Sequence, residues 1–170
     1  KINTVIKRST NEDEILELVE RFSNREIAVR FIEFMDVGNT NGWSMDEVVS
    51  AEEIRDIIGE LSTIPPNNPS DVAKKYRLPN GGEVGIISSV TEPFCNECTR
   101  ARISSDGRLF TCLFSNKGLD ILSLMRGGKD DSEISAVIQE YWKSRDDRYS
   151  EIRSKNSKIE DRVEMSYIGG

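Results

Sequence analysis

The sequence has 170 residues, of which 36% are hydrophobic and 31% charged, and its formal net charge is −7. A chain of this length can form one domain with a hydrophobic core, or one domain and part of another. The composition is that of a soluble globular protein without a membrane span, and the negative charge argues against nucleic acids or anionic membranes as partners, because both select a basic surface.

The first 34 residues predict a β-strand, an α-helix and a second β-strand. Residues 1–6 alternate and are rich in branched side chains, which favours a strand. Cap residues at 10–13 precede an apolar stripe of helical spacing at 15–22. Residues 27–34 (IAVRFIEF) are nearly continuously apolar, as in a parallel strand buried on both faces. This order indicates a βαβ unit, and therefore an α/β fold with a parallel sheet or a piece of a barrel.

A polar loop at residues 36–42 follows the second predicted strand. It lies at the edge where parallel α/β folds build their sites. A helix is predicted at 51–61, and the segment 65–69 (PPNNP) then interrupts the pattern. We interpret this interruption as a boundary between two domains, at residues 1–64 and 65–170.

Beyond this boundary the predicted elements are shorter. Strands are expected near residues 72–77 and 82–87, and helices at 119–126 and 132–142. The cysteine region lies between these strands and helices.

Three cysteines, Cys95, Cys98 and Cys112, form the pattern C-x2-C-x13-C in a chain without histidine. A cysteine pair two residues apart directs both sulfurs at one ion, but a closed structural zinc site needs four protein ligands. The three thiols therefore predict a metal site with one open position. Their odd number argues against a secreted disulfide framework and favours a cytoplasmic protein. The start Lys-Ile-Asn, without methionine, predicts the C-terminal part of a longer protein.

Asp106 and Gly107 are a strong hairpin signal between the second and third cysteines. A two-residue turn would set Cys112 opposite Ala101, and a three-residue turn starting at Ser105 would set it opposite Arg100. Either register brings the third thiol back toward the CxxC end.

Arg100 and Arg102 are two residues apart, so on a strand they share a face. Two guanidinium groups beside thiolates can hold a phosphate or another acidic group bidentately. Ordinary surface charge on a hairpin is the alternative interpretation.

The spacing of the thiols leaves several kinds of site open. A CxxC pair occurs in redox proteins and in zinc sites, and a carboxylate or water can complete a zinc site in a non-catalytic interaction module. Three thiolates also suit a [4Fe–4S] cluster that keeps one iron for a ligand other than cysteine. A small electron-transfer protein would normally complete its cluster with a fourth cysteine.

Four segments of the chain resemble one family. They are FCNECTRARISSDGRLFTCLF at residues 94–114, RFIEFMDVGNTNGW at 30–43, DDRYSEIR at 146–153 and YIGG at 167–170. These segments are similar to the C-terminal half of the GTP 3′,8-cyclases, the radical-SAM enzymes of molybdenum cofactor biosynthesis. The resemblance runs through the whole chain, and the block CxxCTRARxSSDG is highly specific.

The resemblance implies an incomplete (β/α) barrel of the radical-SAM type, followed by an α+β domain with a cluster, a GTP site and a diglycine tail. It implies two [4Fe–4S] clusters that face one cavity. The N-terminal cluster, held by CxxxCxxC, would cleave S-adenosylmethionine to a radical that takes hydrogen from C3′ of GTP. The C3′ radical would attack C8 of guanine and give 3′,8-cyclo-7,8-dihydro-GTP. A homodimer is implied, with the product passed to cyclic pyranopterin monophosphate synthase.

Carried to this sequence, the resemblance implies that Cys95, Cys98 and Cys112 hold the C-terminal cluster. It assigns GTP contacts to the following residues: Lys1, Arg30, Arg100, Ala101 and Arg102. Met35 would touch S-adenosylmethionine, and Gly169-Gly170 would be the tail that reaches the active site.

Each assignment outside the cysteines has a simpler alternative. Lys1 could be a terminal residue without a role, and Met35 could be core packing. Arg30 interrupts an apolar strand, so its charge needs a partner or a ligand. Gly169-Gly170 could be an unstructured end. The sequence contains no CxxxCxxC, so we expect this chain alone to be inactive and the full-length protein to be the lyase.

Overall fold

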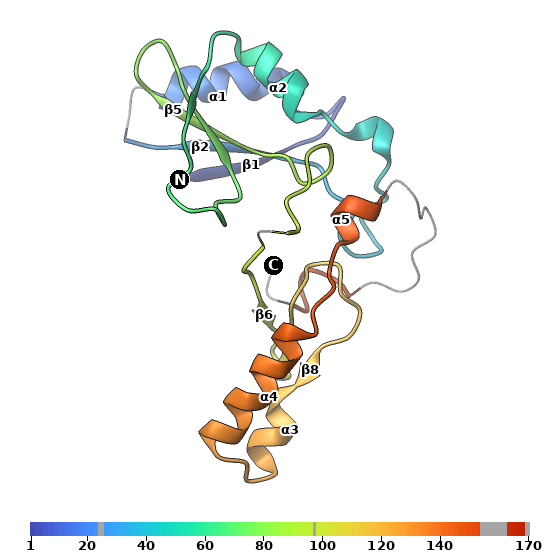
Figure 1. The fold of residues 1–170 in the computed structure, drawn as a ribbon. Coiled ribbons are helices and arrows are strands. Elements are labelled where there is room, and N and C mark those ends of the chain that lie inside the picture. The colour runs from blue at the N-terminus through green and yellow to red at the C-terminus, as the bar shows by residue number, and fades with distance from the viewer. Residues whose placement is uncertain (24–25, 97, 154–162, 169–170) are drawn as a thin grey trace. The chain divides into compact units, whose positions relative to one another are not determined.

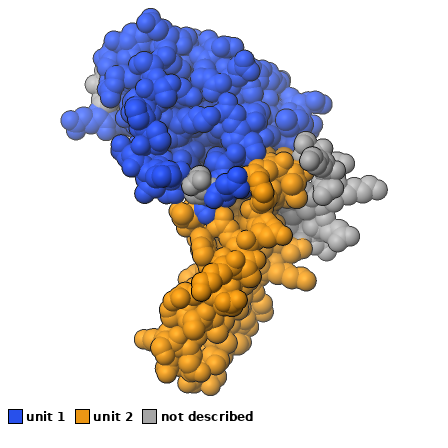
Figure 2. All heavy atoms as spheres, in the orientation of Figure 1, with its two compact units in different colours: residues 1–36, 43–98 blue, residues 37–42, 99–170 orange. Residues whose placement is uncertain are grey.

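The structure is a computed structural model that describes residues 1–23, 26–96, 98–153 and 163–168. The chain forms two compact units, shown in different colours in Figure 2. Unit 1 consists of Lys1–Asp36 and Trp43–Cys98, and unit 2 consists of Val37–Gly42 and Thr99–Gly170. The predicted boundary at residue 65 between two domains stays a prediction. Gly169-Gly170, the predicted tail, lies outside the described residues.

Unit 1 contains a five-stranded mixed sheet in the order β1-β2-β5-β4-β3. The bounds of its strands are β1 Ile2–Ile6, β2 Val29–Glu33, β3 Ser62–Ile64, β4 Lys74–Arg77 and β5 Glu83–Ile87. β1, β2 and β5 are parallel, whereas β4 is antiparallel to β5 and β3 antiparallel to β4. This arrangement confirms an α/β fold, and the incomplete barrel stays a prediction.

Two helices, α1 (Ile15–Phe22) and α2 (Ala51–Ile58), lie along one side of this sheet (Figure 1). Short 3₁₀ helices, η1 (Glu12–Glu14) and η2 (Met45–Glu47), precede them. The helices and the sheet bury apolar side chains against each other, and those with 0% exposure include Ile6, Ile15, Phe31 and Ile54. The hydrophobic core of unit 1 therefore lies between the helices and one face of the sheet.

The predicted βαβ unit is confirmed, but β2 has two different faces. Val29, Phe31 and Glu33 are buried beneath the helices, whereas Arg30 and Ile32 on the opposite face are half-buried. The prediction that this strand is buried on both faces is therefore wrong for the face that carries Arg30.

The predicted helix at 51–61 ends three residues early. Gly59 has φ +89 and ends α2 after Ile58, because a positive φ suits glycine and is incompatible with a continuing helix. At its start, Ser50 and Glu53 form a capping box, in which each side chain accepts a hydrogen bond from the backbone N–H of the other residue. The residues after Gly59 continue into β3, a strand that the sequence pattern did not predict.

In its described residues, unit 2 contains a three-stranded antiparallel sheet and three helices. Its elements are β6 Arg102–Ile103, β7 Arg108–Phe110, β8 Leu119–Asp120, α3 Ile121–Arg126, α4 Asp131–Lys143 and α5 Tyr149–Ile152. The predicted helix at 119–126 is wrong over its first two residues, which pair with β7. Asp120 then caps α3 by accepting a hydrogen bond from Ser123 N. The predicted helix at 132–142 is confirmed by α4.

Candidate functional site

Cys95 and Cys98 lie in unit 1, in the segment that follows β5. The backbone N–H of Cys98 donates to the carbonyl oxygen of Cys95 at 3.2 Å, so the segment turns between the two cysteines. Both side chains are half-buried. The CxxC spacing of these two cysteines is typical of zinc and cluster sites.

Cys112 lies in unit 2, two residues after the end of β7. The backbone N–H of Phe114 donates to Cys112 Sγ at 3.4 Å, and Ser115 N donates to the Cys112 carbonyl at 3.3 Å. Hydrogen bonds to sulfur stabilise thiolate ligands and tune iron–sulfur clusters. The residue before it, Thr111, is buried and donates to Asp147 at 2.5 Å, which fixes the backbone beside the thiol.

Of the two turns that the sequence left open, the hairpin between β6 and β7 has the three-residue one. Ser104 N donates to the carbonyl of Arg108, and Gly107 N donates to the carbonyl of Ser104, both at 2.9 Å. Gly107 has φ +79, the left-handed conformation that this turn needs at its third position. The observed pairs are Ile103 with Leu109 and Arg102 with Phe110. The predicted position of Cys112 opposite Arg100 lies beyond the observed pairs, because β6 begins at Arg102 and β7 ends at Phe110, and it stays a prediction.

The three residues predicted to contact GTP on this hairpin differ in exposure. Arg100 and Ala101 are exposed and precede β6, whereas Arg102 is half-buried and begins the strand. Arg100 and Cys112 each lie two residues outside the last observed pair of this hairpin, Arg102 with Phe110, and all of them belong to unit 2. Their contact with a ligand stays a prediction.

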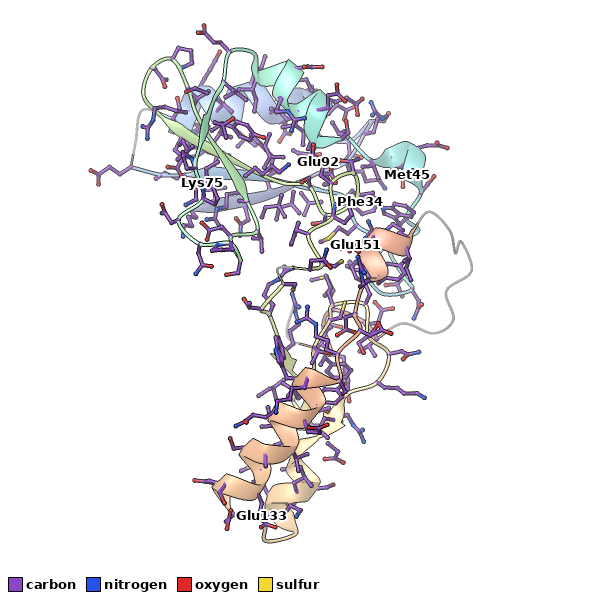
Figure 3. The ribbon with its side chains drawn as sticks, in the orientation of Figure 1. Phe34, Met45, Lys75, Glu92, Glu133 and Glu151 are labelled. Carbon is purple, nitrogen blue, oxygen red and sulfur yellow. The ribbon has the colours of Figure 1, made fainter. Side chains whose placement is uncertain are left out.

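Lys1 and Arg30 belong to unit 1, on the face of the sheet opposite the helices. Arg30 pairs with Asn3 of β1 and Gly85 of β5, and the row continues to Lys75 of β4 (labelled in Figure 3). Lys1 precedes β1 and, by the alternation of a strand, shares the face of Asn3. The structure thus places Lys1, Arg30 and Lys75 on one sheet face.

Gly85 makes room for the side chain of Arg30. A Cβ atom at position 85 would lie 3.1 Å from Arg30 Cγ and 3.4 Å from Ala73 Cβ. Since these contacts are at or below ordinary van der Waals distance, the arginine stem lies over the glycine. Lys75 forms an ion pair with Asp71 at 3.6 Å, and the side chain of Lys75 is only 17% exposed.

Met35 follows β2 and is half-buried. It stands at the C-terminal end of the parallel strand, where ligand sites of α/β folds are built. Its predicted contact with S-adenosylmethionine stays a prediction.

The described C-terminal residues 163–168 contact the β6–β7 hairpin and the loop 37–42 within unit 2. Tyr167 Oη donates to Asp106 at 2.6 Å, and Ile168 is fully buried. Glu164 accepts a hydrogen bond from Asn39 N at 2.7 Å. Hydrogen bonds from Ser104 and Tyr167 lower the pKa of the Asp106 carboxyl. The hydrogen bond between Tyr167 and Asp106 also raises the pKa of the Tyr167 hydroxyl. Sequence reasoning identified the terminal motif but not these contacts.

Glu33 is a second residue whose contacts sequence reasoning missed. Its carboxylate is fully buried and accepts hydrogen bonds from the segment that leads to Cys95. The available signal was the same as for Arg30, namely a charge within an apolar strand.

The donor set fits the predicted cluster, because three thiols in a chain without histidine leave one position open. Among the residues that the structure describes, no group of three or more cysteine or carboxylate side chains is gathered as a metal site. Cys95 and Cys98 belong to one compact unit and Cys112 to the other. Their meeting at one cluster stays a prediction.

In the part of the chain that the structure describes, no helix is long and apolar enough to cross a membrane.

Comparison with known proteins finds GTP 3′,8-cyclases among the relatives of this chain. A GTP 3′,8-cyclase of Staphylococcus carnosus (strain TM300) is 44% identical over 178 residues, covering 100% of this chain and 52% of the relative. The GTP 3′,8-cyclase of Xanthomonas campestris pv. campestris (strain B100) is 43% identical over 174 residues, covering 100% of this chain and 51% of the relative. The chain therefore spans about half the length of the curated relatives it matches.

The family described as Molybdenum Cofactor Synthesis C matches residues 27–151. This range contains all three cysteines, both hairpin arginines and Arg30. Because the match covers most of the sequence, the chain belongs to the Molybdenum Cofactor Synthesis C family.

Proposed function

We propose that this chain is the C-terminal half of a GTP 3′,8-cyclase of molybdenum cofactor biosynthesis. The observation that carries the proposal is the family match over residues 27–151, which includes all three cysteines and the arginines beside them. The similarity to GTP 3′,8-cyclases along the full chain supports it.

In this proposal Cys95, Cys98 and Cys112 hold a [4Fe–4S] cluster. The turn between Cys95 and Cys98 and the N–H group directed at Cys112 Sγ support thiolate ligation at both ends of the motif. When bound, the cluster would supply an iron without a cysteine ligand, which takes the guanine base of GTP.

The remaining contacts to GTP would come from cationic residues and one small residue. Arg100, Ala101 and Arg102 lie at the hairpin end that carries Cys112, which suits contacts near the base and ribose. Lys1 and Arg30 lie on the face of the unit 1 sheet opposite the helices, where they would hold the triphosphate. Guanidinium and ammonium groups suit phosphate oxygens because their hydrogen bonds are charge-assisted.

The radical chemistry would belong to the complete protein. Met35 would contact S-adenosylmethionine, and a second cluster in an N-terminal half would generate the radical, so this chain alone would be inactive. The complete lyase would be a cytoplasmic homodimer that passes its product to cyclic pyranopterin monophosphate synthase. Its fold would be an incomplete barrel, of which residues 1–64 of this numbering form the last βα units, followed by a domain at 65–170 with the cluster, the GTP site and the diglycine tail.

Anaerobic reconstitution of the full-length protein tests the cluster. We expect a brown protein that contains two [4Fe–4S] clusters. Cys112→Ser should lower the iron content by the amount held in one cluster. Met125→Ser, which replaces an exposed sulfur side chain in α3, should keep both. A colourless protein with stoichiometric zinc at the three cysteines would instead identify a zinc-binding module and overturn the proposal.

A further inference from the structure

Glu33 stands out because it is a carboxylate with 0% exposure at the end of β2. Its neighbour across the sheet is Ile6, which is also 0% exposed. A carboxylate in such surroundings is strongly unfavourable unless hydrogen bonds replace the lost water. The contacts of Glu33 should therefore identify what this buried charge does.

Four hydrogen bonds reach the two oxygens of Glu33, and all four donors are neutral. Oε1 accepts from Ala51 N at 2.7 Å and from Thr91 Oγ1 at 2.5 Å. Oε2 accepts from Val90 N at 2.7 Å and from Thr91 N at 2.9 Å. Ala51 is the first residue of α2, and the N–H groups of the first helical turn have no partner within the helix. Glu33 thus joins β2, the start of α2 and the segment after β5.

The segment after β5 leads directly to the first two cysteines. Ser88, Ser89 and Val90 are buried, and only Glu92, Pro93 and Phe94 separate Thr91 from Cys95. Proline fixes its own φ and restricts the residue before it, so few free torsions lie between the hydrogen-bonded Thr91 and the thiol.

Glu92 (labelled in Figure 3) holds the same segment from the surface side. It forms ion pairs with Lys74 at 2.5 Å and Arg55 at 3.6 Å. These pairs are partly exposed and contribute little alone. The segment just before the CxxC turn is therefore held by buried hydrogen bonds to Glu33 and by partly exposed ion pairs of Glu92.

We propose that Glu33 is a positioning residue for the cluster, which sets the place of Cys95 and Cys98 through the backbone of Val90 and Thr91. This inference rests on the proposed function, because it concerns the cluster that the cysteines would hold. Groups that orient metal ligands from outside the ligand shell typically change metal affinity about 10-fold to 100-fold when they are removed.

Glu33→Gln is the direct test, because its amide keeps the shape of the carboxylate. Each oxygen of Glu33 accepts from two donors. The amide nitrogen must take one of these positions, where it is itself a donor and leaves two donors unpaired. Thr91→Val is the milder variant, since it removes the hydroxyl hydrogen bond at an exposed residue and leaves the two N–H bonds to Oε2.

Glu53→Gln is the matched control. Glu53 accepts hydrogen bonds from Ser50 N at 2.9 Å and Arg8 at 2.6 Å. It therefore supports the same end of α2 as Glu33 does, through residues that lie outside the segment before Cys95.

The experiment uses the full-length protein with the cysteines of its N-terminal CxxxCxxC replaced by alanine, so that iron reports the C-terminal cluster. Iron and sulfide per chain, the EPR spectrum of the reduced cluster and the rate of bleaching by an iron chelator are measured. Thermal unfolding of the same samples reports the fold. We expect roughly 10-fold faster bleaching and an altered EPR spectrum in Glu33→Gln. Thr91→Val should show a smaller change in the same direction, and Glu53→Gln should match the parent.

Parent-like bleaching and EPR spectra in folded Glu33→Gln and Thr91→Val would overturn this inference alone. The inference would also be overturned if Glu33→Gln and Glu53→Gln both lost iron in the same proportion to the fall in their unfolding temperatures. If Glu33→Gln does not fold, Thr91→Val decides. A parent protein that binds no iron would overturn the proposed function, and this inference with it.

Discussion

Tyr167 donates a 2.6 Å hydrogen bond to the carboxylate of Asp106, a residue 61 positions earlier in the chain. The Tyr167 ring also meets the ring of Phe110 edge to face, with centroids 6.3 Å apart. Tyr167 therefore attaches the C-terminal segment to the turn and second strand of the β6–β7 hairpin within unit 2.

This contact predicts a specific pH dependence of stability. Hydrogen bonds from Ser104 and Tyr167 lower the pKa of Asp106 in the folded state. Because its pKa is lowered in the folded state, ionised Asp106 stabilises the fold. This stabilisation is fully present above the pKa of aspartate in the unfolded chain, about 3.9, and is lost as pH falls through the lower folded pKa. Tyr167→Phe should lower the unfolding midpoint at pH 7 and reduce the loss of stability on acidification below about pH 4.

Thermal unfolding of the full-length protein between about pH 3 and pH 7 checks this expectation. Tyr141→Phe is the control, because Tyr141 donates to the carbonyl of Lys117 at 3.3 Å, an acceptor that does not titrate. Acid profiles of the two variants that run parallel would contradict the role of Asp106.

The hairpin arginines should contribute to GTP affinity through charge as well as geometry. Hydrogen bonds to charged groups contribute about 1.5–3 kcal/mol each, so Arg100→Met and Arg102→Met should each weaken GTP binding at least about 10-fold. Calorimetry on the cluster-loaded full-length protein without S-adenosylmethionine measures this change. Arg108→Met is the control on the same hairpin, because Arg108 is paired with Asp106 and Asp120. An equal loss in that variant would mean that only overall charge matters.

Gly85→Ala should act on GTP through Arg30. The added Cβ would come within 3.1 Å of Arg30 Cγ, so the arginine must move by a few tenths of an ångström. We expect GTP affinity to fall roughly threefold, less than in Arg30→Ala. In an Arg30→Ala background the same substitution should have no further effect, because its target is gone. If the losses of GTP affinity from Gly85→Ala and Arg30→Ala were additive in the double variant, Gly85→Ala would not act through Arg30.

The capping box of α2 should contribute measurably to the stability of unit 1. Ser50→Ala removes the acceptor for Glu53 N and should lower the free energy of unfolding by about 1 kcal/mol. Ser62→Ala is the control, since Ser62 lies exposed on the edge strand β3 and its hydrogen bond to Arg77 is long, at 3.5 Å. Chemical denaturation that gives both variants the same midpoint would contradict the cap.

Local patterns in the sequence were sufficient for the elements whose cause is local. Branched and apolar periodicity predicted β1, α1 and β2, and their order predicted the parallel pairing of β1 with β2. Asp106-Gly107 predicted the hairpin, and the three-residue turn fits the left-handed φ of Gly107. The cysteine spacing and its arginines led to the family, because these residues are adjacent in the chain.

Only the tertiary structure revealed β3 and β8, the two faces of β2, and the contacts of Glu33 and Tyr167. β3 and β8 are three and two residues long, and strands this short are stabilised by the partner beside them rather than by their own pattern. Glu33 receives its hydrogen bonds from residues 18, 57 and 58 positions away, so its buried charge has no local explanation. Side-chain type shows that a charge needs donors, but only the folded chain decides which segments supply them.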